Sequence, residues 1–284
     1  MTSNLERIAA EALAIEQEEA RQAGTLGFMA RVVVQATLPH RNPKASEFER
    51  RNGDFVLSLM APKKIGLPFG RYPRLLLAWV ATEAVRTKDP ELHLGDSLSG
   101  FMAELGLTPT GGRWGTITRL RLQVQRLFAS TISATIDRRA DGEWIEAGFR
   151  VARSTNLWWD PKKPDQLALY GSTVMLSQEF FESVVDRPIP VDMRALKALR
   201  SPLALDLYTW LTWRMSYLGK PTEIPWEALA LQFGSDYKQL RQFKAAVLKQ
   251  LATVLQLYPE ARVAEGRSGL VLKPSPTHVR KLVE

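Results

Sequence analysis

The chain contains no cysteine. This excludes disulfide frameworks, thiol nucleophiles and cysteine-ligated zinc sites, and it fits a reducing compartment such as the cytoplasm. Long hydrophobic runs are also missing, because the longest, at Leu75–Ala81, is far short of the roughly 20 residues that span a bilayer. The N-terminus has no basic-then-apolar signal pattern. We therefore expect neither export nor a membrane span.

Motifs of catalysis are scarce as well. The three histidines stand far apart, at His40, His93 and His278, and neither His-x-His nor His-Glu-x-x-His occurs. The segment "GLPFGRYP" lacks the Gly-Lys-Ser/Thr of a P-loop, and "HVRK" lacks the His-x-x-Arg spacing of tyrosine recombinases. We expect no enzymatic activity, no cofactor and no metal site.

What the chain has in excess is positive charge. Its net charge is +8 over 284 residues, and its isoelectric point is near 9.8. The first 24 residues carry five acids and two bases, so residues 25–284 have a net charge of +11. Such a body favours an anionic partner, with nucleic acid first and a membrane surface second.

The positive charge is concentrated in two stretches without acids. No Asp or Glu occurs between Leu105 and Ile136, and none between Asp236 and Glu260. A helix exposed only to solvent gains from mixed signs at i,i+4, so an unmixed cationic helix indicates a negative partner outside the chain.

Both stretches belong to a diverged internal repeat. The first copy reads "YPRLLLAWVATEAVRT", "LHLGDSLSGFMAELG" and "WGTITRLRLQVQRLFAS"; the second reads "SPLALDLYTWLTWRMS", "TEIPWEALALQFG" and "DYKQLRQFKAAVLKQLAT". Each begins with a proline, Pro73 or Pro202, at a predicted helix start. A second short helix ends in Gly106 or Gly234, where glycine allows a left-handed corner. This layout predicts a helix-turn-helix in each copy.

The predicted third helices align at an offset of 123 residues. Each carries an apolar stripe at i, i+3, i+7 and i+11, which predicts that one side packs onto its own domain. The aligned pairs are Ile117 with Leu240, Leu120 with Phe243, Val124 with Val247, and Phe128 with Leu251.

A hairpin signal follows each third helix. In the first copy, "ASTISATIDRRADGEWIEAGFRVA" turns at Asp141-Gly142, and in the second "ARVAEGRSGLVLKPS" turns at Gly266–Gly269. The sequence thus predicts a helix-rich α+β fold with two tandem winged-helix domains. We place an N-terminal helical segment at 1–24, which either docks or contacts a partner, the first winged helix at 25–185 and the second at 186–284. "DPKKPDQ" is either a linker or a loop within the first wing sheet.

The face of each third helix opposite its stripe supplies the candidate DNA contacts, because such helices enter a major groove. Arg, Lys and Gln can bind phosphates or base edges, and Ser235 is placed to cap its helix. Lys244 and Arg121 lie beside the stripes and are expected to pack. The candidates are Ser235, Lys238, Gln239, Arg241, Gln242 and Lys249, with wing residues Arg262, Arg267 and Lys273, and in the first copy Arg113, Thr116, Arg119, Gln123 and Arg126, with wing residues Arg138 and Arg139.

The chain resembles plasmid replication initiators of the RepA/TrfA type. The likeness runs from about residue 27 to the C-terminus and rests on segments such as "GFMARVVVQATLPH", "PTGGRWGTITRLR", "SPLALDLYTWLTWR" and "FGSDYKQLRQFK". It implies binding of origin direct repeats (iterons) by monomers, melting of AT-rich DNA, and recruitment of the host helicase and initiator. It also implies dimers that join through the first domain.

By position, the resemblance makes Lys238, Gln239, Arg241 and Gln242 the major-groove contacts of the second domain, and Arg113 and Arg119 those of the first. Some members carry a clamp-binding peptide at the N-terminus, and "LERIAAEALAIEQEEARQ" contains none. Three alternatives remain: a repressor that binds a palindromic operator as a dimer, a DNA-processing enzyme, and a protein-interaction scaffold.

Overall fold

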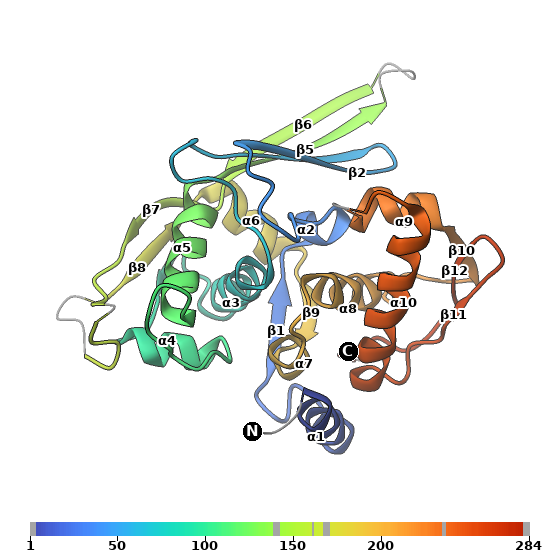
Figure 1. The fold of residues 1–284 in the computed structure, drawn as a ribbon, viewed down its shortest axis with the longest axis horizontal. Helices are drawn as coiled ribbons and strands as arrows, with labels where there is room; N and C mark the ends of the chain where they lie inside the picture. Colours follow the sequence, from blue (N-terminus) through green and yellow to red (C-terminus); the bar gives the residue numbers. More distant parts are fainter. Residues whose placement is uncertain (1–3, 139–142, 161, 167–170, 235–236, 281–284) are drawn as a thin grey trace.

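The structure is a computed structural model that describes residues 4–138, 143–160, 162–166, 171–234 and 237–280. Two helical units lie side by side, with strands β1 (Leu26–Met29) and β9 (Ile189–Asp192) between them (Figure 1). Each unit contains a long buried helix, a helix-turn-helix and a small antiparallel sheet.

The first unit has the element order of a winged helix. A three-stranded sheet with the order β4-β8-β7 covers its helices. Its elements are α3 (Arg71–Thr87), β4 (Glu91–His93), α4 (Leu98–Glu104), α5 (Thr116–Ala129), β7 (Ala152–Asn156) and β8 (Thr173–Leu176).

The second unit repeats this topology. Its sheet has the order β10-β12-β11, which matches β4-β8-β7 strand for strand. Its elements are α8 (Pro202–Met215), β10 (Thr222–Pro225), α9 (Trp226–Phe233), α10 (Leu240–Leu257), β11 (Val263–Glu265) and β12 (Gly269–Leu272). The predicted tandem winged-helix fold is confirmed.

The hairpin predicted as the first wing is formed, but it is not the wing. Strands β5 (Thr131–Arg138) and β6 (Glu143–Arg150) extend β2 (Glu47–Asn52) and β3 (Phe55–Met60) into a four-stranded sheet. This sheet crosses the top of the molecule above α2 (Arg31–Gln35) and α9 (Figure 1). A hairpin pattern fixes the local turn and not the third strand that joins it, and here β3 pairs with β5 along its full length. The predicted turn at Asp141-Gly142 lies outside the described residues.

The first wing is formed instead by β7 and β8, two strands that follow the predicted hairpin in the chain. The segment "DPKKPDQ" lies between these two strands, so it is a loop of the wing sheet and not a linker between domains.

Helices α3 and α8 form the centre of the two cores. Most of their side chains are buried all round, including Leu76 and Trp79 in α3 and Tyr208 and Trp210 in α8. Burying one such large side chain stabilises the fold by about 1.5–3 kcal/mol. Ser201 caps α8 by accepting a hydrogen bond from the Ala204 N–H, and Pro202 follows at the first helical position, as predicted.

Two predicted details of the repeat are wrong. Gly106 has the expected left-handed φ of 66°, but Gly234 has φ −78° and is needed for space, since a Cβ there would lie 2.7 Å from the Ala230 carbonyl oxygen. Leu240, assigned to the apolar stripe, is 39% exposed, whereas its partner Ile117 is buried. It is the first residue of α10, where the helix has only begun to contact the core.

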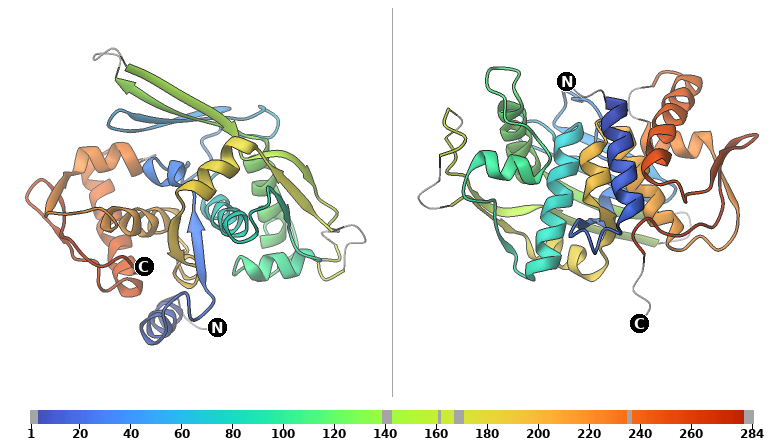
Figure 2. Two further views of the ribbon diagram at one scale, coloured as in Figure 1. Left: turned by 180° about the vertical axis from the view of Figure 1, so that it is seen from behind. Right: turned by 90° about the horizontal axis from the view of Figure 1, so that it is seen from below.

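The N-terminal segment docks on the body. Helix α1 (Asn4–Gln17) lies within the predicted N-terminal helical segment, and its Ile8 is buried. Arg194, in α7 (Met193–Ala198), donates hydrogen bonds to the carbonyl oxygens of Ala14 and Glu18 at the end of α1. Seen from below, α1 lies across the molecule between α3 and α10 (Figure 2).

The two units share several elements rather than a linker. Strand β1 pairs antiparallel with β9, which follows α6 (Gln178–Asp186), and α2 (Arg31–Gln35) contacts α8. The proposed domain boundary at 185 stays a prediction.

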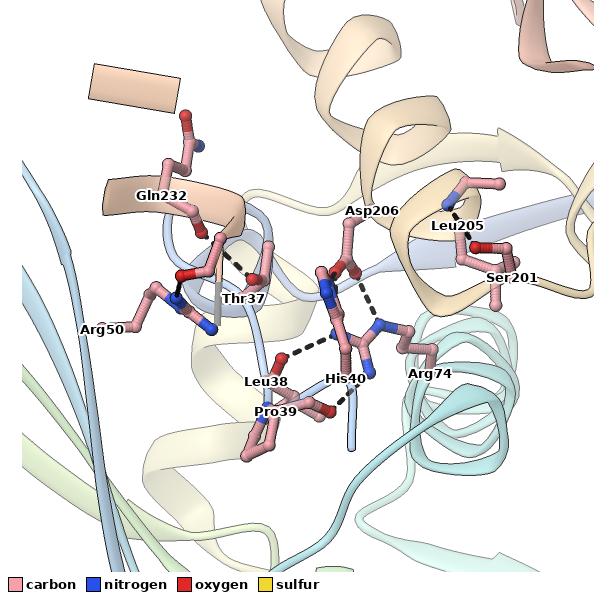
Figure 3. Close-up of polar contacts among 12 residues, drawn as sticks. Thr37, Leu38, Pro39, His40, Arg50, Arg74, Ser201, Leu205, Asp206 and Gln232 are labelled. Atoms are coloured by element: carbon pink, nitrogen blue, oxygen red, sulfur yellow. Dashed lines mark hydrogen bonds and ion pairs between the residues drawn. The ribbon is translucent and has the colours of Figure 1, made fainter. Parts of the chain in front are cut away.

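A buried ion pair joins the central helices of the units. Arg74 of α3 binds both carboxylate oxygens of Asp206 of α8, at 2.6 and 2.7 Å (Figure 3). Its other N–H groups reach the carbonyl oxygens of Leu38, Pro39 and Gly70. All five guanidinium donors are therefore used, the condition under which a buried charge is tolerated.

Further hydrogen bonds hold α9 to the N-terminal part of the first unit. Thr37 donates to the Gln232 carbonyl oxygen at 3.1 Å, and the Gln232 side chain donates to the Gln35 carbonyl oxygen at 3.0 Å. Arg50 donates to the carbonyl oxygen of Gly234 (Figure 3). The relative orientation of the two units is thus fixed by specific polar contacts as well as by packing.

Candidate nucleic-acid interface

The turn before α5 is built from threonine and glycine. The Thr116 N–H donates to the Thr110 hydroxyl at 2.9 Å, and the Thr110 N–H donates to the Thr116 hydroxyl at 2.8 Å. A Cβ at Gly115 would lie 2.2 Å from the carbonyl oxygens of Thr110 and Gly111, so only glycine fits this corner. The turn fixes where α5 begins and presents its N-terminus to solvent.

Three candidate residues of the first unit lie at this end of α5. Arg113 and Arg119 are exposed, and Thr116 is half-buried in the turn. The guanidinium of Arg113 lies 5.0 Å from the ring centre of Trp114, which is 72% exposed. The sequence did not single out Trp114, although a tryptophan beside an arginine in a helix-turn-helix corner is a visible signal for base or sugar contact.

Two other candidates on α5 are engaged by the rest of the fold. Gln123 is buried, and its amide oxygen accepts a hydrogen bond from the Phe69 N–H at 2.9 Å. Arg126 donates to the Ile65 carbonyl oxygen at 3.0 Å and lies 5.0 Å from the Phe69 ring centre. Burial lowers the pKa of Arg126.

The prediction that Gln123 lies on the outer face is therefore wrong, whereas Arg126 is half-buried. The loop before α3, which contains Ile65 and Phe69, packs across this part of α5. A helical wheel shows which residues share a face, but it does not show which loop covers that face.

The corresponding end of the second unit is more open. Helix α10 begins at Leu240, with Gln239 at the N-cap and no side-chain cap. The predicted cap, Ser235, lies outside the described residues. Lys238, Gln239, Arg241 and Gln242 are all exposed, and Arg241 donates to the Gln239 amide oxygen at 2.7 Å.

The two lysines of α10 differ in their surroundings, as the sequence predicts. Lys249 is exposed on the outer face. Lys244 packs instead, since its Nζ lies 2.5 Å from Glu265 Oε1 and 5.4 Å from the Trp226 ring centre. The uncapped N-terminus of α10 adds the partial positive charge of its free N–H groups to the exposed cations.

The second wing is held at its turn by Glu223, which accepts hydrogen bonds from the Ser268 N–H and hydroxyl at 2.8 and 3.1 Å. These bonds lower the pKa of Glu223. Arg262, Arg267 and Lys273 are exposed on this wing. The candidate wing residues of the second unit therefore lie where a DNA backbone could reach them.

The first wing carries different cations from those predicted. Arg138 ends β5 in the four-stranded sheet, with its side chain outside the described part of the chain, and Arg139 lies wholly outside it. The actual wing exposes Arg153 on β7 and Lys162 and Lys163 in its loop. The "KK" of "DPKKPDQ" was a visible signal, missed because the hairpin before it had been assigned as the wing.

Two features are absent from the described part of the chain. No group of three or more His, Cys, Asp or Glu side chains in it is placed to hold a metal ion. No helix among the described residues has both the length and the apolar character needed to cross a membrane.

A protein-family model described as "Plasmid encoded RepA protein" matches residues 67–228, more than half of the chain. The chain belongs to this family. RepA proteins are plasmid replication initiators, which bind DNA at an origin and are typically DNA-binding rather than catalytic proteins. No curated protein matches the chain.

One solved structure supports the fold. The crystal structure of RctB domains 2-3 is 14% identical, with a TM-score of 0.51, covering 85% of this chain and 96% of that one. A structure of SeMet derivatives of the same two RctB domains is 13% identical, with a TM-score of 0.49, covering 83% of this chain and 94% of that one. At such identity, the RctB domains 2-3 likeness concerns the fold alone.

Proposed function

We propose that this RepA-family protein binds direct repeats at a plasmid origin through both winged helices. Bound there, it promotes melting of adjacent DNA and recruits the host helicase and initiator. It acts as a monomer in equilibrium with a homodimer that joins through the first domain, it works in the bacterial cytoplasm, and it carries out no catalysis of its own.

The observation that carries this proposal is that one chain exposes two different sets of cationic side chains, each at the start of the third helix of a winged helix. The first has Arg113 and Arg119 at the start of α5, and the second has Lys238, Arg241 and Gln242 at the start of α10. Since the surfaces differ, one chain matches an asymmetric site, whereas a palindrome requires two copies of one surface related by a twofold axis.

The contacts between the units support the same conclusion. The Arg74–Asp206 pair and the pairing of β1 with β9 hold α5 and α10 in one relative orientation. A fixed orientation favours a fixed spacing between the two contacted grooves. Direct repeats of constant length supply that spacing.

The test is a selection from random duplexes, followed by footprinting of the recovered sites at physiological salt. We expect one asymmetric site of about two helical turns for each monomer. A short palindrome would indicate a dimeric repressor instead, and an absence of enrichment would contradict DNA reading by both helices. A variant with Lys238→Ala and Arg241→Ala should lose one half of the footprint, while Arg187→Ala, at an exposed position far along the sequence, should keep both.

Origin melting and host recruitment need separate measurements. Permanganate reactivity of thymines beside the selected repeats reports melting, and it should rise only when the protein and a supercoiled template are both present. Co-purification of host helicase with the protein–origin complex reports recruitment. If neither occurs while the direct repeats are bound, the protein reads the repeats without initiating replication.

A further inference from the structure

Two arginines from separate parts of the chain meet at the end of α7, and a third follows the last residue of that helix by two positions. They are Arg7 in α1, Arg71 at the start of α3, and Arg200, which immediately precedes the Ser201 cap of α8. Arg7 and Arg71 both donate to the Lys197 carbonyl oxygen, at 3.2 and 2.7 Å. Because they share one acceptor, their guanidinium groups lie next to each other.

This cluster has little negative charge to balance it. The acceptors at the end of α7 are backbone carbonyls, which carry only partial charge. In the part of the chain that the structure describes, no carboxylate forms an ion pair with Arg7, Arg71 or Arg200. Glu11 is the acid that acts on Arg7 through space.

The pKa values of Arg71 and Arg7 reflect the same excess of positive charge. Burial, followed by the positive charge of Arg7 and Arg200, lowers the pKa of Arg71 to about 10. Burial and Arg200 also lower the pKa of Arg7. Three like charges held together in this way favour an anion between them.

Unpaired hydrogen-bond donors and two helix N-termini also favour an anion at this cluster. The Nε–H groups of Arg7 and Arg71 are buried without an acceptor, an arrangement that is costly unless an ion or water completes it. Helices α3 and α8, of 17 and 14 residues, both begin beside the cluster, and α3 has no side-chain cap. The positive ends of two helix dipoles thus add to the three guanidinium charges.

We propose that Arg7, Arg71 and Arg200 form a binding site for a phosphate group. A tetrahedral dianion offers acceptors in several directions, which suits guanidinium donors that approach from three elements. Arg200 is exposed and gives access from solvent. Since α1 supplies Arg7, α3 supplies Arg71 and Arg200 leads into α8, a bound phosphate ties the N-terminal helix to both winged-helix units.

The first experiment is thermal unfolding of the full chain in inorganic phosphate and in chloride at equal ionic strength. At a phosphate concentration ten times the dissociation constant, the melting temperature should rise by about 2–4 °C. Arg200→Gln should abolish this rise, whereas Arg187→Gln, which removes an exposed charge paired only locally with Asp186, should keep it. Equal melting temperatures in phosphate and chloride, or a rise that survives Arg200→Gln, would overturn the proposal as regards free phosphate.

The second experiment distinguishes free phosphate from the DNA backbone, and this arm rests on the proposed function. If a backbone phosphate occupies the site, Arg200→Gln should reduce the slope of log affinity against log salt by about 0.9, with sequence preference unchanged. A melting rise with an unchanged slope assigns the site to free phosphate. If neither the rise nor the slope responds to Arg200→Gln, the site does not exist. Loss of all duplex selection would contradict the proposed function while leaving the phosphate measurement intact.

Discussion

Arg241 is the side chain of the second unit best placed to read a base. It is exposed near the N-terminus of α10, and its hydrogen bond to Gln239 orients the guanidinium without occupying its terminal nitrogens. Such a group can bind guanine in a bidentate manner.

We expect Arg241→Ala to weaken binding of the selected site by about 1–3 kcal/mol and to relax preference at one base position. Repeating the selection with the variant measures both effects. Lys249→Ala is the matched control on the same helix. We expect it to weaken all duplexes equally, because we assign this lysine to phosphate contact alone. Equal losses on all sequences for Arg241→Ala would assign it to the backbone too.

Gln123, unlike Arg241, is a polar side chain of a third helix that stabilises the fold. Its amide oxygen is the acceptor for the Phe69 N–H, which becomes unpaired if the side chain is truncated. We expect Gln123→Ala to lower the free energy of unfolding by about 1 kcal/mol and to leave sequence preference unchanged. Urea denaturation measures the free energy of unfolding, and a repeated selection measures the sequence preference. A changed base preference at full stability would show that Gln123 reaches DNA after all.

At the scale of elements, the first wing offers a test of backbone contact. Lys162 and Lys163 are exposed between β7 and β8, so we expect them to meet phosphates beside the groove that α5 is proposed to enter. Replacing both with alanine should reduce the slope of log affinity against log salt by roughly 1.8, since each phosphate contact contributes about 0.9. Lys63→Ala with Lys64→Ala, in the exposed loop after β3, is the matched control pair. The assignment fails if both pairs change the slope equally.

The elements also show what the sequence could and could not predict. Apolar stripes, start prolines and glycine corners are local signals, so the helices of both repeats and the tandem order were predictable. The partner of a strand is set by contacts far along the chain, and for this reason β5 and β6 were assigned to the wrong sheet. The covering of Gln123 by the loop at Phe69 was unpredictable on the same ground, because a helical wheel carries no information about distant segments.

At the scale of the whole molecule, acid should destabilise the protein through His278. This side chain packs against Tyr208 and Tyr258, with Nδ1 2.6 Å from the Tyr208 hydroxyl. Burial lowers its pKa to about 4, with Asp192 opposing and Arg194 adding to the shift. The unfolded chain, with a histidine pKa near 6.5, therefore binds a proton that the folded chain rejects.

This difference in pKa between the folded and unfolded chain sets the direction in which stability changes with pH. Stability from this group is complete above about pH 6.5 and falls as the pH drops towards 4, by up to about 1.4 kcal/mol for each pH unit. Urea denaturation between pH 7 and pH 5 measures the slope, above the range in which most carboxylates titrate. His278→Gln should reduce this slope and leave the part that buried His40 contributes, since the pKa of His40 is also lowered by burial. His93→Gln, at an exposed histidine, should leave the slope unchanged. An unchanged slope in His278→Gln would assign the acid sensitivity elsewhere.

The buried pair between the units governs both stability and geometry. Burial raises the pKa of Asp206, but Arg74 and the His40 hydrogen bond outweigh it, so the pKa lies below its ordinary value and Asp206 is ionised. His40, whose pKa is lowered mainly by burial, is neutral and donates from Nε2 at 2.7 Å. One carboxylate thus holds α8 to α3 and to the loop at His40.

Asp206→Ala leaves the Arg74 charge buried without its partner and should lower the free energy of unfolding by about 3–5 kcal/mol. Arg86→Ala, which breaks an exposed pair with Glu83 on the same helix, should cost at most about 1 kcal/mol. Replacing both Arg74 with Met and Asp206 with Leu should recover most of the loss, because no buried charge then remains.

The double variant separates stability from geometry. If the ion pair fixes the angle between the units, the stable Arg74→Met, Asp206→Leu protein should bind single half-sites normally and lose its preference for the native spacing between them. Binding to duplexes with the half-sites moved apart by one to five base pairs measures this. A spacing preference as sharp as that of the unmodified chain would show that β1–β9 pairing and the α9 contacts suffice to orient the two winged helices.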